Sequence, residues 1–458
     1  MTHRGDRSHP LDAVFTDRGL SLAGLAELFR AAVTARGFRS GADRNLTWKW
    51  KTGRRVPTEE SQWYLADALG VPRQLVIDLG WPEWLRHAVA GSPSVLDVPW
   101  SPAGTARVLR DIAGGRMDRR GFMIVTGGAL SGVAASWAGA LEGASSSPAA
   151  PDAAGDPGRL SAATVDRVGH RLAELRHLDD ALGGARLHQL AVAEFSWLTQ
   201  LVETAGYETP TGRRLVGLIT EAARPCGWLH FDASLHAAAQ SYYIAGLRCS
   251  ATAQDPLAGA HILACMSLQA TWTGHHQDAV TLIESAQERL GGDATPRLRA
   301  LLASRKALAH ARAGEAAACG RALNSAERLL DAVSPGTWEP DWIYYFDEAE
   351  LAGHAGACWI ALRQPARARP LLDTTLRTTD PSFVRDRAIQ HTWSAEAHLQ
   401  DGELDLACEE LGAAVDLAHR TASARAIATI RQTRQAMSRY DRETRVRELD
   451  RRLATFAA

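Results

Sequence analysis

The stretches GHHQDAVTLIESA (274–286) and GELDLACEELGAA (402–414) show the pattern that decides the fold of this chain. Each begins with a glycine, and alanines follow five and twelve residues after it. The glycine marks the turn of a helical hairpin. Small residues at the two alanine positions let neighbouring helices approach closely, where a large side chain would force them apart. Both stretches therefore predict a hairpin whose second helix packs tightly.

The same pattern recurs five times between residues 211 and 420. The turns lie near Ala233, Gly274, Gly314, Arg363 and Gly402, at intervals of 41, 40, 49 and 39 residues. The small-residue positions are Ala238, Ala279, Cys319, Ala368 and Ala407, followed by Ala245, Ala286, Ala326, Thr375 and Ala414. One hairpin cannot bury its own apolar face, so the hairpins are expected to stack. The sequence thus predicts an all-α fold, with residues 161–458 forming an α-solenoid.

These spacings resemble those of the tetratricopeptide-repeat family, with a period longer than the usual value of about 34 residues. The resemblance implies a concave groove that is lined by the first helix of each hairpin. A peptide or small-molecule effector would bind in that groove. The repeat positions select His230, His261, Ser304, Glu350, Thr392 and Glu396 as groove candidates.

The segment WEPDWIYYFDEAELAGHAG (338–356) occupies the longest interval and mixes aromatic with acidic residues. One interpretation is a ligand pocket for a peptide or a basic small molecule, to which Tyr345 and Glu350 would contribute. The other is that Trp342 and Phe346, four residues apart, are core residues and that the acids form a solvated face. The spacing alone leaves both open.

A basic stretch, DRNLTWKWKTGRRVP (43–57), stands out because the whole chain has a net charge of −1 and a pI of about 7.0. Between Arg36 and Arg55 there are seven basic residues and one acid. The stretch is predicted to be a short helix that Asp43 caps and Gly53 stops. A local excess of positive charge on a helix suits contact with a polyanion, and DNA is the natural candidate.

Residues 19–72 resemble the helix-turn-helix of Xre-type regulators, through DRNLTWKWKTG, the exit RRVP and LADALGVP (65–72). The resemblance implies a DNA-binding domain over residues 11–90, a recognition helix near 44–51 and a buried Trp50. The residues expected at base edges or sugars are Arg44, Asn45, Thr47 and Trp48. The residues expected at phosphates are Lys49, Lys51, Arg54 and Arg55. The chain departs from the family in having a longer connection before the recognition helix. The alternative is a small helical domain whose basic face binds a protein or no partner.

Residues 91–160 are expected to form a linker, since they are punctuated by proline and end in a low-complexity run. Within them, residues 117–140 resemble a twin-arginine export signal, with Arg119, Arg120 and a run of small apolar residues. An export signal belongs at the N-terminus. The favoured interpretation is an internal structural segment packed on a domain surface, and the other is that Met117 is the true start.

The remaining composition argues against an enzyme. Six cysteines are scattered singly, which predicts reduced, buried thiols in a cytoplasmic protein rather than disulfides or a metal site. Phosphate-binding loops and hydrolase or metalloprotease motifs are missing from the sequence, so neither a cofactor nor a metal is expected. Arginine outnumbers lysine 48 to 3, which is typical of high-GC bacterial genomes.

These observations favour a cytoplasmic transcription regulator of the high-GC Gram-positive type, which binds double-stranded DNA and senses an effector through its repeats. A homodimer is expected because one helix-turn-helix reads few bases, and no membrane association is expected. The alternative is a tetratricopeptide-repeat scaffold for protein–protein interaction that does not bind DNA.

Overall fold

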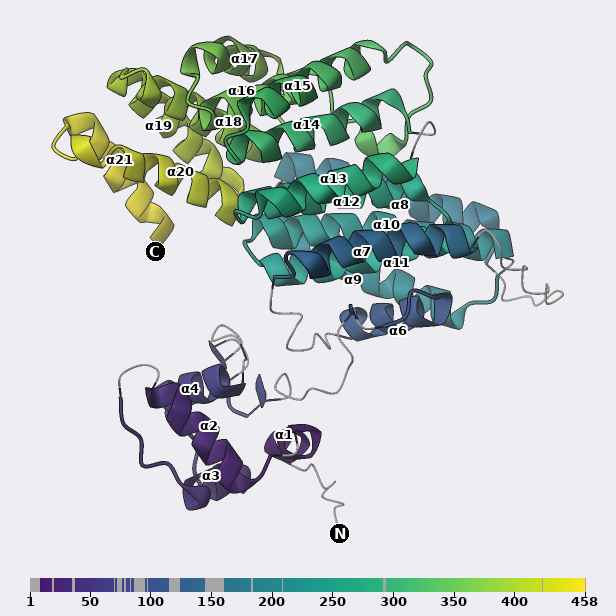
Figure 1. The fold of residues 1–458 in the computed structure, drawn as a ribbon, viewed down its shortest axis with the longest axis vertical. Helices are drawn as coiled ribbons and strands as arrows, with labels where there is room; N and C mark the ends of the chain where they lie inside the picture. Colours follow the sequence, from purple (N-terminus) through teal and green to yellow (C-terminus); the bar gives the residue numbers. More distant parts are fainter. Residues whose placement is uncertain are drawn as a thin grey trace. The chain divides into compact units, whose positions relative to one another are not determined.

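The computed structural model describes residues 9–18, 20–34, 38–69, 71, 76–77, 80–82, 84–85, 95–96, 98–114, 124–144, 160–182, 184–207, 209–290, 294–421 and 423–457. All regular secondary structure in these residues is helical, so the all-α prediction is confirmed (Figure 1). The chain divides into two compact units, one of residues 1–98 with 114–124 and one of residues 99–113 with 125–458. Across the described residues, every helix is too short or too polar to cross a membrane.

The N-terminal unit is built from α1 (Pro10–Arg18), α2 (Leu22–Thr34), α3 (Arg44–Lys51) and α4 (Glu59–Leu69). Asp43 caps α3 as predicted, because its side chain accepts a hydrogen bond from the Leu46 backbone N–H at 2.9 Å. Trp50 is 2% exposed and packs edge-on against Phe29, with ring centroids 5.2 Å apart. The predicted core position of Trp50 is therefore confirmed.

The larger unit contains the other helices whose bounds are described. They are α6 (Pro102–Ala113), α7 (Gly128–Ala144), α8 (Ala162–Leu182), α9 (Gly184–Thr204), α10 (Thr209–Asp232), α11 (His236–Ala253), α12 (Pro256–Trp272), α13 (His276–Leu290), α14 (Pro296–Arg312), α15 (Ala316–Asp331), η3 (Asp341–Ile343), α16 (Glu348–Ala361), α17 (Pro365–Thr378), α18 (Val384–Gln400), α19 (Leu404–Thr421), α20 (Ala424–Ala436), η4 (Ser438–Tyr440), α21 (Thr444–Ala454) and η5 (Thr455–Ala457). Five hairpins, from α10–α11 to α18–α19, follow one another along the chain. Their first helices, α10, α12, α14, α16 and α18, each contact the next and form an inner layer that α20 continues. This is the predicted stack of helical repeats.

The hairpin turns have the backbone that the sequence pattern requires. Gly274, Gly314 and Gly402 have φ angles of 86°, 79° and 82°, in the left-handed region that favours glycine. Arg363 takes the same conformation with φ of 59°, as does Ser234 with φ of 62° beside the predicted turn at Ala233.

The ten small-residue positions also behave largely as predicted. Ala238 is half-buried. The side chains of the other nine are 0% exposed. The close approach of neighbouring helices therefore explains why these positions hold alanine, cysteine or threonine.

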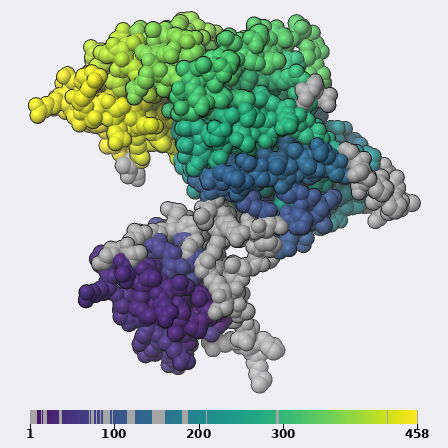
Figure 2. All heavy atoms as spheres, viewed as in Figure 1, coloured from purple at the N-terminus to yellow at the C-terminus, as the bar shows by residue number. Residues whose placement is uncertain are grey.

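The expected linker, residues 91–160, contributes two helices to the larger unit. Helix α6 packs on α9 and α11, and α7 packs on α11 and α13, where it forms the blue band across the repeats in Figure 2. Trp137 of α7 is fully buried and donates a hydrogen bond from Nε1 to Ser250 Oγ at 2.9 Å. Gly259 is needed at this contact, because a Cβ there would lie 2.5 Å from Trp137 Nε1. Part of the export-like segment is thus an ordered helix on the repeat surface, while residues 117–123 lie outside the described residues.

Candidate functional site

A pocket of about 1180 Å³ lies on the inner layer of the repeat unit. Its walls come from α10, α12, α14, α16 and α18, with further residues from α8 and α20. The first helices of the hairpins therefore line a concave site, as the repeat pattern predicts. The volume slightly exceeds the roughly 300–1,000 Å³ typical of small-molecule sites, so a small molecule or a short peptide segment fits.

The two ends of the helical array meet beside this pocket, because α10 contacts α20 and α8 contacts α18. At the first contact, Asp232 Oδ1 accepts hydrogen bonds from Arg425 Nε at 3.1 Å and Ser423 Oγ at 2.9 Å. At the second, Arg385 Nη1 lies 3.3 Å from Asp179 Oδ2. These ion pairs join helices that are far apart in sequence, and Asp179, Arg385 and Arg425 lie in the pocket wall.

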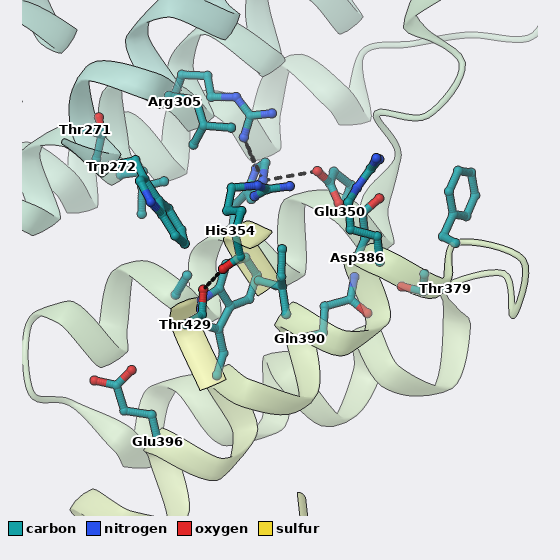
Figure 3. Close-up of a pocket in the computed structure, with 18 of the residues that line it drawn as sticks. Thr271, Trp272, Arg305, Glu350, His354, Thr379, Asp386, Gln390, Glu396 and Thr429 are labelled. Carbon is teal, nitrogen blue, oxygen red and sulfur yellow. Dashed lines mark hydrogen bonds and ion pairs between the residues drawn. The ribbon is translucent and has the colours of Figure 1, made fainter. Parts of the chain in front are cut away.

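His354 occupies a central position in the pocket wall, between Arg305 and Glu350 (Figure 3). Arg305 Nη1 lies 2.7 Å from His354 Nε2, and Glu350 Oε1 lies 3.1 Å from the same nitrogen. His354 Nδ1 is 2.9 Å from Ser304 Oγ. Burial and the charge of Arg305 lower the pKa of His354, which outweighs the opposing effect of Glu350. The ring is therefore neutral near pH 7 and positions Arg305 without neutralising its charge.

Arginines are the most frequent charged residues of the pocket wall. They are Arg176, Arg224, Arg305, Arg312, Arg363, Arg385, Arg425 and Arg439. Three of them have carboxylate partners: Arg176 pairs with Glu221 and Asp341, while Arg385 and Arg425 form the pairs that close the array. The carboxylates of the wall are Asp179, Asp347, Glu350, Asp380, Asp386 and Glu396.

Aromatic and apolar side chains complete the wall. Trp228, Trp272 and Trp393 come from α10, α12 and α18, and Phe383 precedes α18. The Arg425 guanidinium lies 5.0 Å from the Trp228 ring centroid, which is within the range of a cation–π contact. The pocket thus combines fixed positive charges with flat apolar surfaces.

The structure brings three of the seven groove candidates to this pocket, namely Tyr345, Glu350 and Glu396. The other four are engaged elsewhere or buried behind the wall. His261 Nε2 lies 3.0 Å from the Tyr345 hydroxyl, and its ring stacks on Trp342 at 4.4 Å. Ser304 and Thr392 are 0% exposed. These residues support the wall rather than face a ligand.

His230 is also not in the pocket. Its Nε2 lies 3.1 Å from His188 Nε2, and its Nδ1 lies 2.7 Å from the carbonyl oxygen of Cys226. Burial lowers the pKa of His230 to about 4, since the Cys226 carbonyl offsets only part of that effect and His188 adds to it. His230 is therefore a neutral core histidine.

The aromatic segment 338–356 combines both of the interpretations that its sequence allows. Trp342 and Phe346 are 7% and 0% exposed, so they are core residues. Tyr344 and Tyr345 line the pocket. Asp347 caps α16 by accepting a hydrogen bond from the Glu350 backbone N–H at 2.9 Å. The segment therefore supplies both a core anchor and a pocket wall.

Sequence reasoning missed the arginines of the pocket. Arg224 lines the pocket beside Trp228 of α10, and Arg305 lines it beside Leu308 and Arg312 of α14. An arginine within a largely apolar stretch on the first helix of a hairpin is a signal that could have marked them. Among the described residues, groups of three or more histidine, cysteine or acidic side chains placed to hold a metal ion are absent.

In the N-terminal unit, the basic face of α3 is partly available to a partner. Arg44, Asn45, Arg54 and Arg55 are exposed. The Arg54 guanidinium lies 4.6 Å from the Trp48 ring centroid, and Trp48 itself is half-buried. These five residues form what we call the α3 basic face.

The fold excludes the predicted DNA contact of Thr47, and it engages Lys51 in a surface ion pair. Thr47 is 0% exposed, and its hydroxyl donates to the Leu22 carbonyl at 2.8 Å, so it cannot reach a base. Lys51 Nζ lies 2.7 Å from Asp12 Oδ1, which ties this lysine to α1. Lys49 is half-buried. Thr47 points inward because position 47 falls on the same face of α3 as Trp50, toward α2.

The connection between α2 and α3 also differs from the Xre pattern. Residues 35–43 separate the two helices, whereas a helix-turn-helix joins its helices through a turn of about three or four residues. The longer connection expected from the sequence is thus present. The register of α3 as a recognition helix remains a prediction.

Comparisons with known proteins give little further information. The chain matches no protein-family model, and it matches no curated protein. It is similar to a solved structure described as "Crystal structure of APC/C hetero-tetramer Cut9-Hcn1", with 13% sequence identity and a TM-score of 0.34. That match covers 92% of this chain and 74% of the other. Similarity at this level supports no argument about partners, so the description of the repeats rests on their own helices.

Proposed function

We propose that this chain is a binding protein whose helical repeats hold a ligand in the pocket of the inner layer. The observation that carries the proposal is a cavity of about 1180 Å³ with buried charged side chains in its wall. Arg305, Arg385 and Arg425 are each 5% exposed and lie on that wall. Burying charge in a wall with no function is costly, so a site of this composition favours ligand recognition over simple packing.

The proposal is tested by filling the pocket. Ala428 is exposed and lines the wall on α20, so an Ala428→Trp side chain enters the cavity without overpacking the core. Ala317 is an exposed alanine on α15 away from the pocket, which makes Ala317→Trp the matched control. The probes are two fluorescent dyes with the same aromatic body, neutral N-phenylnaphthylamine and anionic anilinonaphthalene sulfonate.

We expect wild type and Ala317→Trp to bind at least one dye with the same affinity and one-site stoichiometry. In Ala428→Trp, we expect that affinity to fall by about tenfold or more, since the ring occupies the volume that the dye needs. Equal binding by Ala428→Trp and wild type, for both dyes, would show that the pocket is not a binding site.

We also propose, as a second function, that the N-terminal unit binds DNA. The exposed guanidinium groups of Arg44, Arg54 and Arg55 beside exposed Asn45 support it. Arginine side chains on one face of a helix contact phosphates and base edges in the way that DNA recognition requires. With DNA binding, the chain would be a transcription regulator, and a homodimer would place two α3 helices on two half-sites. Without it, the repeats would act as a scaffold or carrier.

DNA binding is tested by fluorescence anisotropy with a random duplex at several salt concentrations. Three phosphate contacts, one for each exposed arginine, give a log–log salt slope of roughly −2.7, at about −0.9 per contact. We expect the triple variant Arg44→Ala, Arg54→Ala, Arg55→Ala to lose measurable affinity at low salt. A triple variant that binds as tightly as wild type would reject this second function and leave the first intact.

A further inference from the structure

We infer that the ligand of the pocket is an organic anion, with a carboxylate or phosphate group joined to a flat apolar body. This inference rests on the proposed function, because it names the chemistry of the ligand that the same pocket holds. The guanidinium of Arg305 and that of Arg224 receive the anionic group, and the tryptophans of the wall hold the apolar body.

Arg305 carries a buried charge with no contacting carboxylate among the described residues. Its two hydrogen bonds, at 2.7 and 3.2 Å, both run from Nη1 to the His354 ring. The Nη2 side of the guanidinium therefore has no partner in the described part of the chain. A guanidinium donates through a planar fork, so its free edge fits two oxygens of a carboxylate or phosphate.

Arg224, like Arg305, has no carboxylate partner among the described residues. It is half-buried on α10 and lines the pocket together with Cys265. The charges of Arg224 and Arg305 both oppose the increase that burial causes in the pKa values of Cys265 and Tyr345. Both guanidinium groups line the same cavity, together with Cys265 and Tyr345.

The carboxylates of the wall compensate these two arginines only in part. Against the effect of burial, nearby positive charge, that of Arg305 included, lowers the pKa of Glu350 to about 2, so this one ionised carboxylate offsets part of the charge of Arg305. Asp179 and Asp386 contact Arg385. Burial raises the pKa of Glu396, which weakens its tendency to carry charge. The local excess of positive charge therefore sits at Arg224 and Arg305, and it favours an anion over the basic ligand that the acids of segment 338–356 suggest.

Flat apolar surfaces lie in the same cavity. Trp272 stands beside Arg305 and His354 in the pocket wall (Figure 3). The ring centroids of Trp393 and His354 are 6.5 Å apart, and Trp228 also lines the pocket. Tryptophan faces hold planar apolar groups well. A ligand with an anionic head and a ring system matches both parts of the wall.

The test compares the two dyes in variants that remove one charge each. We expect Arg224→Gln and Arg305→Gln each to weaken anilinonaphthalene sulfonate about tenfold or more, as expected for loss of a hydrogen bond between charged groups. N-phenylnaphthylamine should bind the variants as it binds wild type. Arg445→Gln is the control, since Arg445 is 60% exposed, pairs with Asp405 and lies outside the pocket wall.

Arg224 is only half-buried, so Arg224→Gln keeps the test decisive if Arg305→Gln does not fold. If anilinonaphthalene sulfonate binds Arg224→Gln as tightly as wild type, the inference of an anionic ligand is wrong. This holds even if Ala428→Trp still abolishes dye binding. If Ala428→Trp has no effect on either dye, the proposed function itself fails.

Displacement of the bound sulfonate separates the two sources of the anion. Adenosine monophosphate is compared with adenosine, and N-acetyltryptophan with its amide, because each pair differs in its anionic group. Displacement by the monophosphate indicates a phosphate ligand, and displacement by the free acid indicates a carboxylate ligand, such as the C-terminus of a peptide. Either result supports the inference. Equal displacement by the charged and neutral members of both pairs would overturn it.

Discussion

Charged groups are buried in the pocket of the repeat unit and exposed on the α3 basic face. In the pocket, Arg305, Arg385 and Arg425 are each 5% exposed. On the α3 basic face, Arg44, Arg54 and Arg55 are exposed. Buried charges need partners within the fold because desolvation is costly. Exposed charges need none, and salt screens them.

This contrast separates structural from functional contributions. In the pocket, Arg385 and Arg425 also hold the array together, so a substitution of either changes stability and binding at once. On the α3 basic face, the charges contribute little to stability, so a substitution there reports on binding alone. The following predictions run from the largest expected effect to the smallest.

The largest effect is expected where the array closes. Asp232→Ala leaves the buried Arg425 guanidinium without its carboxylate, and loss of one partner of a buried ion pair costs about 3–5 kcal/mol. Urea unfolding measures this loss in the free energy of unfolding. Arg445→Ala, which breaks the exposed pair with Asp405, is the control and should leave the free energy of unfolding nearly unchanged. Equal losses of unfolding free energy in Asp232→Ala and Arg445→Ala would show that the buried and the exposed ion pair contribute equally to stability.

A second effect depends on pH. The pKa of His230 is lowered from 6.5 to about 4 in the folded chain, so the unfolded chain binds the proton more tightly. The stabilisation from neutral His230 is complete above about pH 6.5 and is lost as the pH falls toward about 4. Between pH 7 and pH 5, wild type should lose about 1–2 kcal/mol more stability than His230→Gln, by urea unfolding at both values. Equal losses of stability in wild type and His230→Gln would contradict the lowered pKa of His230.

The hairpin turns provide a third, smaller effect. Gly314 has φ of 79°, and nothing lies within 4 Å of a Cβ added there, so Gly314→Ala tests backbone strain without a clash. The left-handed conformation costs other residues about 1–2 kcal/mol. Thermal unfolding should show a loss of about that size in Gly314→Ala. The reciprocal change, Arg363→Gly, should increase stability by about 1 kcal/mol, and opposite signs in the two variants would be the diagnostic result.

The smallest effect on stability is expected on the α3 basic face. Arg55→Ala removes an exposed side chain and should change the free energy of unfolding by less than about 0.5 kcal/mol. If the N-terminal unit binds DNA, the same variant should reduce the log–log salt slope by about 0.9, as one lost phosphate contact predicts. Anisotropy and thermal unfolding of the same preparation check both quantities.

Local spacing in the sequence predicted much of the fold. Turn glycines and paired alanines are short-range features. The small-residue positions of the hairpins, such as Ala245 and Ala414, could therefore be assigned to helix contacts without coordinates. Trp50 was assigned to the core through a family resemblance, and the structure agrees. The same resemblance failed for Thr47, because a shift of three residues along a helix brings a side chain back to the same face.

The pocket itself was only partly predictable. The inner helices were expected to line it, and Tyr345, Glu350 and Glu396 do so. Its arginines were missed because their significance depends on the contact between α10 and α20, which are nearly 200 residues apart in sequence. No spacing rule encodes how far an array curves before its ends meet. The N-terminal DNA contacts remain predictions, since their test requires a partner.

The meeting of α10 and α20 has a consequence for how this protein varies in evolution. In an open array, each repeat contacts only its neighbours, so repeats are gained or lost with little effect on the others. Here the bond from Asp232 to Arg425 spans the whole series of hairpins. An inserted hairpin would move the two ends apart and break that bond. The number of hairpins is therefore fixed by geometry, and the array should unfold as one cooperative body rather than from its ends.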